Sequence, residues 1–171
     1  MTIAIERIGP DTPDAIVDRL ATLLEDAVES GATVSFLGGL THAQATTWWR
    51  SLLADLSSRS IVLIARDGND VVGTVQMHPA WAPNQPHRGE VAKLLVHRRA
   101  RRRGIGRALM HDLERRARQD GFRLLMLNTR QGDSAERLYA SLGWTCIGEV
   151  PDYALDPGGV AHATVLLYKQ I

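Results

Sequence analysis

Cysteine is almost absent from this chain of 171 residues, in which Cys146 is the only one. No disulfide can form within the chain, as is typical of proteins in a reducing cytoplasm. The residues around Cys146 are apolar and favour a strand. A free cysteine in such a segment is usually a small buried hydrophobe, so we expect this thiol to pack in the interior and to be unreactive.

Long apolar runs are also missing. No window approaches eighteen uninterrupted apolar residues, which excludes a transmembrane helix. The segment from Met1 to Glu6 has neither the basic start nor the cleavage site of a secretory signal. We therefore expect a cytoplasmic protein that has no membrane partner.

The histidines have no spacing that suits a metal ion, so no metal site is predicted. The four considered are His42, His78, His87 and His162.

Net charge is close to zero, at +1, which argues against general binding of nucleic acid. Its distribution is uneven, however. Nine arginines lie between Arg98 and Arg118, against only Asp112 and Glu114. This block requires an explanation.

The apolar fraction of 44% and the charged fraction of 23% are those of an ordinary globular protein, and we expect residues 1–171 to form one domain. Hydrophobic periodicity and turn residues predict the order β-α-α-β-β-β-α-β-α-β-β, an α/β fold with helices packed on a mixed sheet. Thr12 is expected to cap the first helix, and capping boxes are expected for the second and the last. The predicted strands are 3–8, 61–66, 71–77, 90–97, 122–128, 144–150 and 161–169, and the third helix is 105–119.

The most informative segment runs from Glu90 to Arg107. A strand leads into a turn that contains Gly104 and Gly106, and the turn opens a helix. The first N–H groups of a helix lack partners and attract phosphate oxygens, and glycine lets the backbone approach such an anion. Adjacent arginines add charge-assisted contacts. The pattern fits neither the dinucleotide motif nor the P-loop, and a solvated, arginine-rich helix start is the other interpretation.

The segment resembles the pyrophosphate loop of the GNAT superfamily of N-acetyltransferases, with Arg101, Gly104 and Gly106 at the motif positions. A second resemblance follows in residues 128–144, where Leu138-Tyr139 precedes Gly143-Trp144. The likeness implies a twisted mixed sheet flanked by about four helices, and acetyl-CoA as co-substrate. Carried onto this chain, it places the coenzyme contacts at Leu94, Leu95, Val96, Arg101, Arg102, Arg103, Gly104, Ile105, Gly106, Arg107, Ser134 and Tyr139.

A closer likeness is to the tabtoxin-resistance type of GNAT protein, which acetylates a β-lactam antibiotic. It is carried by residues 31–36, 90–96 and 148–153. It implies a small-molecule amine as acceptor: an antibiotic, a toxin or an amino-acid-like compound. The chain departs from the family at Arg98, where proline is common, and at Gly132, where an asparagine often binds the coenzyme, so that Ser134 takes this contact. Asn128 replaces an acidic residue of the subtype and cannot act as a base.

Three residues are the candidate catalytic groups. Glu90 is expected to take a proton from the acceptor ammonium, directly or through a water, unless it is only a carboxylate at a strand end. In the family, Tyr139 lies near the coenzyme sulfur, where a phenol can protonate the departing thiolate; without the resemblance it would be a core residue. Asn128 would orient the acceptor or bind a water, or else only form hydrogen bonds with backbone groups at the sheet edge. Lys93 is interpreted as a salt-bridge partner on the strand face.

Aromatic residues are expected around the acceptor. Phe36 and Trp81 are candidates for its wall, and Trp48 and Trp49 for core and rim. The alternatives are acetylation of a protein N-terminus or lysine, an acyl-CoA sensor without chemistry, and an arginine-rich helix that binds nucleic acid. The long last strand also makes a homodimer an expectation.

Overall fold

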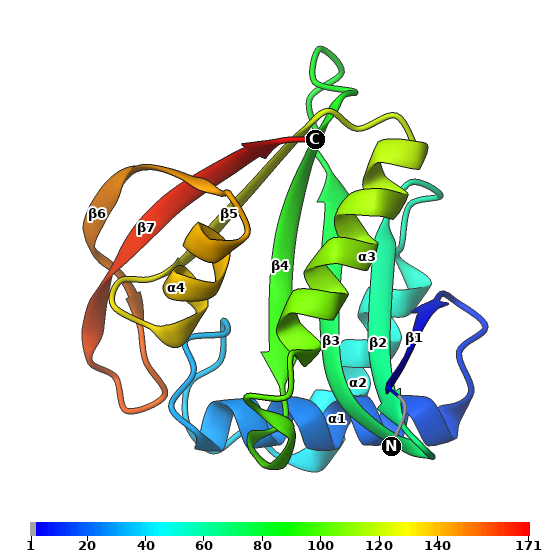
Figure 1. The fold of residues 1–171 in the computed structure, drawn as a ribbon. Helices are drawn as coiled ribbons and strands as arrows, with labels where there is room; N and C mark the ends of the chain where they lie inside the picture. Colours follow the sequence, from blue (N-terminus) through cyan, green and yellow to red (C-terminus); the bar gives the residue numbers. More distant parts are fainter. Residues whose placement is uncertain (1–2) are drawn as a thin grey trace.

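Seven strands form one twisted sheet in the order β1-β2-β3-β4-β5-β7-β6 (Figure 1). The computed structural model describes residues 3–171, so the first two residues of the expected domain lie outside the described residues. Neighbouring strands are antiparallel, except for β4 and β5. The strands are β1 (Ile3–Ile8), β2 (Ile61–Asp67), β3 (Asp70–Pro79), β4 (Arg88–Val96), β5 (Leu124–Arg130), β6 (Thr145–Leu155) and β7 (Ala161–Gln170).

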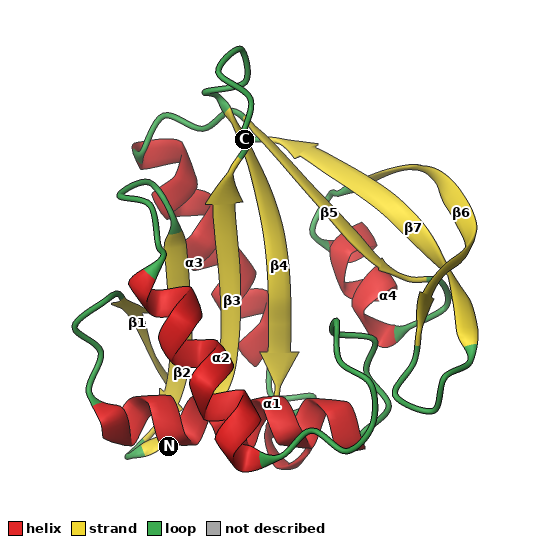
Figure 2. Ribbon diagram, turned by 180° about the vertical axis from the view of Figure 1, so that it is seen from behind, coloured by secondary structure: helices red, strands yellow, loops and turns green. Residues whose placement is uncertain are grey.

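Helices cover both faces of the sheet (Figure 2). α3 (Ile105–Gln119) and α4 (Ser134–Ser141) pack on one side, called here the α3 face, and share a core with Leu63 and Leu125. α1 (Asp14–Glu29) and α2 (His42–Ala54) pack on the other, the α1 face, against Val62 and Ile64. Because successive side chains of a strand point to opposite faces, β2 is buried on both sides. None of the helices in residues 3–171 is long and apolar enough to cross a membrane.

The predicted element order and the mixed α/β sheet are confirmed, with one short 3-10 helix, η1 (Arg98–Ala100), added before α3. The third helix has the predicted bounds, and Thr41 and Gln44 form the predicted capping box. That residues 1–171 form one domain stays a prediction.

Two predicted helix caps are wrong. The Thr12 hydroxyl donates to the carbonyl of Gly9 (2.6 Å) and closes a turn, so α1 begins after Pro13 with no side-chain cap. Asp133 makes no capping bond either. Instead, the Glu136 carboxylate accepts from the N–H of Gly132 (2.6 Å). For Thr12, a local turn offers the hydroxyl a closer partner than the helix end. For Asp133, the N–H of Gly132 takes the Glu136 carboxylate that the capping box would need.

The expectation of a buried Cys146 is also wrong, because its side chain is exposed. β6 is the last strand of the sheet, and no helix covers it along its length. An apolar pattern predicts a strand but does not say whether another layer covers it.

The strands β4 and β5 separate soon after they meet. They pair only from Arg88 to Glu90 on β4 and from Leu124 to Met126 on β5. Beyond Glu90, β4 continues beside β3, whereas β5 continues beside β7. Figure 1 shows the two strands diverging from this point. The facing edges of both strands are therefore left unpaired in the middle of the sheet.

Candidate active site

The turn before α3 leaves the start of the helix open. Gly104 precedes the helix with φ +77°, and no side chain caps the first N–H groups. A Cβ at Gly104 would meet no atom within 4 Å, so the space beside these donors is open. Unpaired N–H groups at a helix start carry partial positive charge, which suits a phosphate.

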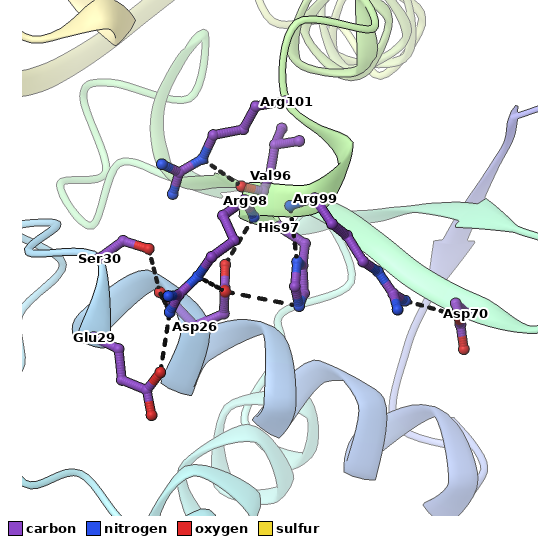
Figure 3. A network of polar contacts seen from close by, with 9 residues as sticks. All are labelled: Asp26, Glu29, Ser30, Asp70, Val96, His97, Arg98, Arg99 and Arg101. Carbon is purple, nitrogen blue, oxygen red and sulfur yellow. Dashed lines mark hydrogen bonds and ion pairs between the residues drawn. The ribbon is translucent and has the colours of Figure 1, made fainter.

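Three of the six arginines around this turn pair with carboxylates, and Figure 3 shows the pairs of Arg98 and Arg99. Arg98 binds Asp26, a carboxylate with only 7% of its side chain exposed, through both its guanidinium and its backbone N–H. Arg99 pairs with Asp70 (2.7 Å), and Arg103 with Asp67 (3.0 Å). These pairs fix the strand–turn segment onto α1 and onto the β2–β3 hairpin. Farther along α3, Arg115 and Arg116 pair with Asp112. Five of the nine arginines in the block are thus paired with carboxylates, which reduces the positive charge that a nucleic-acid surface would need.

Two arginines of the turn keep their charge available. Arg101 donates only to the backbone carbonyl of Val96 (3.1 Å), and Arg102 has no side-chain partner within residues 3–171. Arg107, also expected at the coenzyme, donates to the Ser141 hydroxyl of α4 (2.8 Å). Arg101 and Arg102 are therefore the arginines best placed to face a pyrophosphate.

Two other expected coenzyme contacts point into the protein. Ile105 has its side chain in the core of the α3 face. A Cβ at Gly106 would lie 3.2 Å from the side chain of Leu138, so this glycine allows α4 to pack closely on α3. Both residues offer the coenzyme only their backbone N–H groups.

The free edge of β4 includes the three predicted contacts Leu94, Leu95 and Val96. Leu95 and Val96 pair with Thr74 and Gly73 of β3, and their other edge has no strand partner because β5 has turned away. Unpaired strand N–H and C=O groups can bind an extended ligand that carries amides, as the pantetheine arm of coenzyme A does.

Tyr139 projects from α4 into the core beside Trp144, with the ring centroids 5.9 Å apart. Its hydroxyl makes no hydrogen bond within the described residues, and this oxygen is not fully buried. The ring is thus buried while the hydroxyl retains solvent access. Burial raises the pKa of this phenol above its ordinary value, so the hydroxyl is protonated at physiological pH.

Glu90 and Asn128 lie on the opposite face. Glu90 is the last residue of β4 that pairs with β5, its side chain is 59% exposed, and Arg88 donates to its carboxylate (2.9 Å). Asn128, two residues beyond the last paired residue of β5, is exposed and pairs in register with Leu166 of β7. Ser134 is exposed at the first position of α4. The structure therefore brings Glu90 and Asn128 to the α1 face and Tyr139 to the α3 face, around the point where β4 and β5 part.

A pocket of about 620 Å³ lies beside the α1 face, between the α1–α2 loop and α2. Phe36 and Trp48 line it and meet edge to face, with centroids 5.5 Å apart. Trp49 is fully buried and donates to the carbonyl of Leu20 (3.0 Å), so the prediction of one core and one rim tryptophan is confirmed. Trp81 does not line this pocket and is 91% exposed.

A model of the acetyltransferase (GNAT) family matches residues 20–144, which include the phosphate turn and Tyr139. This chain belongs to the GNAT family. It is an acetyl-CoA-dependent N-acetyltransferase.

Solved structures share the whole fold. A ribosomal-protein-alanine N-acetyltransferase from Brucella melitensis is 22% identical, with a TM-score of 0.80, 98% of this chain covered and 99% of the other. A GCN5-related N-acetyltransferase from Kribbella flavida is 24% identical, with a TM-score of 0.80 and coverage of 99% and 98%. YncA from Salmonella typhimurium, solved with its cofactor acetyl-CoA, is 20% identical, with a TM-score of 0.78 and coverage of 99% and 94%. At such identities, the likeness concerns the fold.

Sequence reasoning gave no role at this site to two residues of β3, His78, which pairs with Glu90, and Gln76, which pairs with Ala92. It also gave Lys93 a different partner. Within the described residues, Lys93 forms no pair with a carboxylate; it donates to the Ser35 hydroxyl (2.9 Å). The one signal in the sequence is a glutamine within a hydrophobic strand. It indicates a polar site only once the residues that face it on β4 are known.

Proposed function

We propose that this GNAT enzyme acetylates the amine of a small molecule, in the manner of the tabtoxin-resistance type. The observation that carries the proposal is the placement of Glu90 and Tyr139 on opposite faces of the sheet, next to the unpaired edges of β4 and β5. A thioester lying along β4 would have a proton acceptor on one side and a proton donor on the other.

Each residue has a distinct task. Acetyl-CoA, when bound, supplies the activated acetyl group. The N–H groups that follow Gly104, with Arg101 and Arg102, hold the pyrophosphate, and the free edge of β4 holds the pantetheine arm. The Glu90 carboxylate takes the proton from the acceptor ammonium, directly or through a water, so that the nitrogen has a free electron pair. The Tyr139 hydroxyl gives its proton to the departing sulfur, and Asn128 orients the acceptor.

The pocket supports a small acceptor: Glu90 and Asn128 do not line it, but its Trp48 ring lies 5.6 Å from the Lys93 ammonium of β4. The pocket is walled by aromatic side chains and by the α1–α2 loop, and this loop is tied to the β6–β7 connection by a bond from the N–H of Gly38 to the carbonyl of Pro157 (2.8 Å). A protein N-terminus is the second candidate, favoured by the similarity to the ribosomal-protein-alanine enzyme. The tied loop narrows the approach that such a large acceptor needs.

Thiol release from acetyl-CoA, corrected for hydrolysis, tests the function over amines, amino acids, polyamines, antibiotics and peptides. We expect turnover with small amines, and a Glu90→Gln variant should lose at least about tenfold in kcat while the affinity for acetyl-CoA holds. Glu6→Gln is a matched control, because that glutamate lies on β1 at the other end of the sheet, three strands from β4, and within residues 3–171 forms an ion pair only with Arg66.

The pH dependence decides what Glu90 does. If Glu90 is the base, the rate of Glu90→Gln should recover at alkaline pH, where the acceptor amine is already neutral. An equal loss at every pH would make Glu90 a positioning residue. Turnover of peptides but of no small amine would overturn the proposed acceptor class.

We also propose a cytoplasmic homodimer. The support for the dimer is β6, an uncovered strand at the end of the sheet that exposes Ile147, Val150, Tyr153 and Leu155. Exposed apolar side chains along an open strand edge favour pairing with another chain. Light scattering should give twice the chain mass, and Ile147→Lys should give the monomer. A monomeric wild type would contradict the proposal.

The cytoplasmic location is supported by Cys146, whose unpaired thiol fits a reducing compartment.

A further inference from the structure

Lys93 occupies an unusual backbone position on β4. Its φ is +52°, in the left-handed region that side chains other than glycine rarely adopt. The register between β3 and β4 shifts here, since Gln76 pairs with Ala92 and Thr74 with Leu95. Two residues of β4, Lys93 and Leu94, therefore oppose one residue of β3. Such a bulge re-aims a side chain, and here it directs Lys93 to the α1 face, toward Ser35 and the Trp48 ring that lines the pocket.

The ammonium of Lys93 is poorly compensated there. It donates to the Ser35 hydroxyl (2.9 Å) and lies 5.6 Å from the centroid of the Trp48 ring. None of the ion pairs within residues 3–171 involves it. An ammonium has three donors, so two are left without a protein acceptor. Burial lowers the pKa of Lys93.

Two polar residues of β3 lie opposite this part of β4, since Gln76 pairs in register with Ala92 and His78 with Glu90. The side chain of Gln76 is 1% exposed, its oxygen is 3.1 Å from His78 Nε2, and its amide nitrogen is buried with no partner. The pKa of His78 is lowered by burial and then by the charge of Lys93, while Glu90 acts in the opposite sense. His78 is thus within electrostatic reach of both Lys93 and Glu90. Unused donors are costly in a folded protein unless a ligand satisfies them.

We propose that Lys93, together with Ser35, binds a carboxylate carried by the acceptor. The acceptor is then an amino-acid-like compound, whose amine faces Glu90 and whose carboxylate faces Lys93. This inference rests on the proposed acetylation of a small amine. The phosphates of the coenzyme do not compete for Lys93, because their binding turn leads into α3 on the other face of the sheet.

Matched acceptors test the inference. Kinetics are measured for each amino acid that is acetylated and for its carboxamide, for example leucine with leucinamide and ornithine with its amide. For the wild type, we expect kcat/KM to favour the acid by at least about tenfold. In Lys93→Met this preference should disappear through a higher KM for the acid, with the KM for acetyl-CoA unchanged. Lys93→Arg should restore part of it, because the positive charge returns.

Arg118→Met is the control, since it removes an exposed cation at the far end of α3. A thermal melt confirms that each variant is folded. If the wild type acetylates amines without preferring the acids, or if Lys93→Met loses acid and amide equally, the inference is wrong while the proposed function stands. If no amine is acetylated, the proposed function is wrong. In that case, calorimetry with the same amino acids tests the anion site independently of activity. Binding to the wild type that is lost in Lys93→Met supports the site. No binding to the wild type, or equal binding to both proteins, overturns it.

Discussion

Replacing Tyr139 with phenylalanine is expected to lower kcat by about ten- to a thousandfold, because a positioned acid typically contributes about 10²–10⁴-fold and solvent can replace part of it. The substitution removes one oxygen and keeps the ring that packs beside Trp144. Because the hydroxyl has no hydrogen-bond partner within the described residues, its removal should leave the melting temperature nearly unchanged. Thiol release and a thermal melt on the same variant provide both measurements.

The two roles of Tyr139 predict opposite outcomes. A tyrosine that only packs would keep its rate, and if its hydroxyl had a buried partner, the loss would cost about 1 kcal/mol of stability. Tyr153→Phe is a suitable control, since Tyr153 is exposed on β6. A normal rate in Tyr139→Phe would remove this residue from the mechanism and leave solvent as the source of the proton.

Replacing Gly104 with valine is expected to weaken acetyl-CoA binding by more than about tenfold. The new side chain would stand in the open space beside the first N–H groups of α3 and exclude phosphate oxygens from it. A β-branched residue at φ +77° is also strained, by about 1–2 kcal/mol, so some loss of stability accompanies the loss of binding. Calorimetry with acetyl-CoA measures the affinity.

Substitution of Gly121 is the control that distinguishes the effect of backbone strain from the effect on coenzyme binding. This glycine has φ +84° and equally open surroundings, but it follows the other end of α3. Gly121→Val should therefore lose similar stability and keep its affinity for acetyl-CoA. Unchanged affinity in a folded Gly104→Val would place the coenzyme elsewhere. Gly106→Val is expected to weaken binding as well, but the cause would be its collision with Leu138, which displaces α4 from α3.

Local chemistry explains why much of the coenzyme side was predictable. The turn at Gly104, the helix that follows it and the hairpin at Asp67–Asp70 are each determined by residues close in sequence, through glycine conformation, helix capping and strand patterning. The linked signatures around Arg101 and Tyr139 indicated the family. Even here, the sequence could not tell which arginines remain available, since Arg98 and Arg103 are neutralised by Asp26 and Asp67 from distant elements.

The sequence alone thus determined the order of the elements, the phosphate turn and the family signatures, because short-range conformational preferences fix them. Tertiary structure decided which groups meet at the acceptor. The strands β4 and β5 separate after Glu90 because β4 remains hydrogen-bonded to β3 and β5 to β7, and these two partners lie on different sides of the separation. The bulge that directs Lys93 toward Ser35 and Trp48 likewise depends on the register of β3 against β4. Register, strand separation and burial arise from contacts between residues far apart in the chain, and no local pattern encodes them.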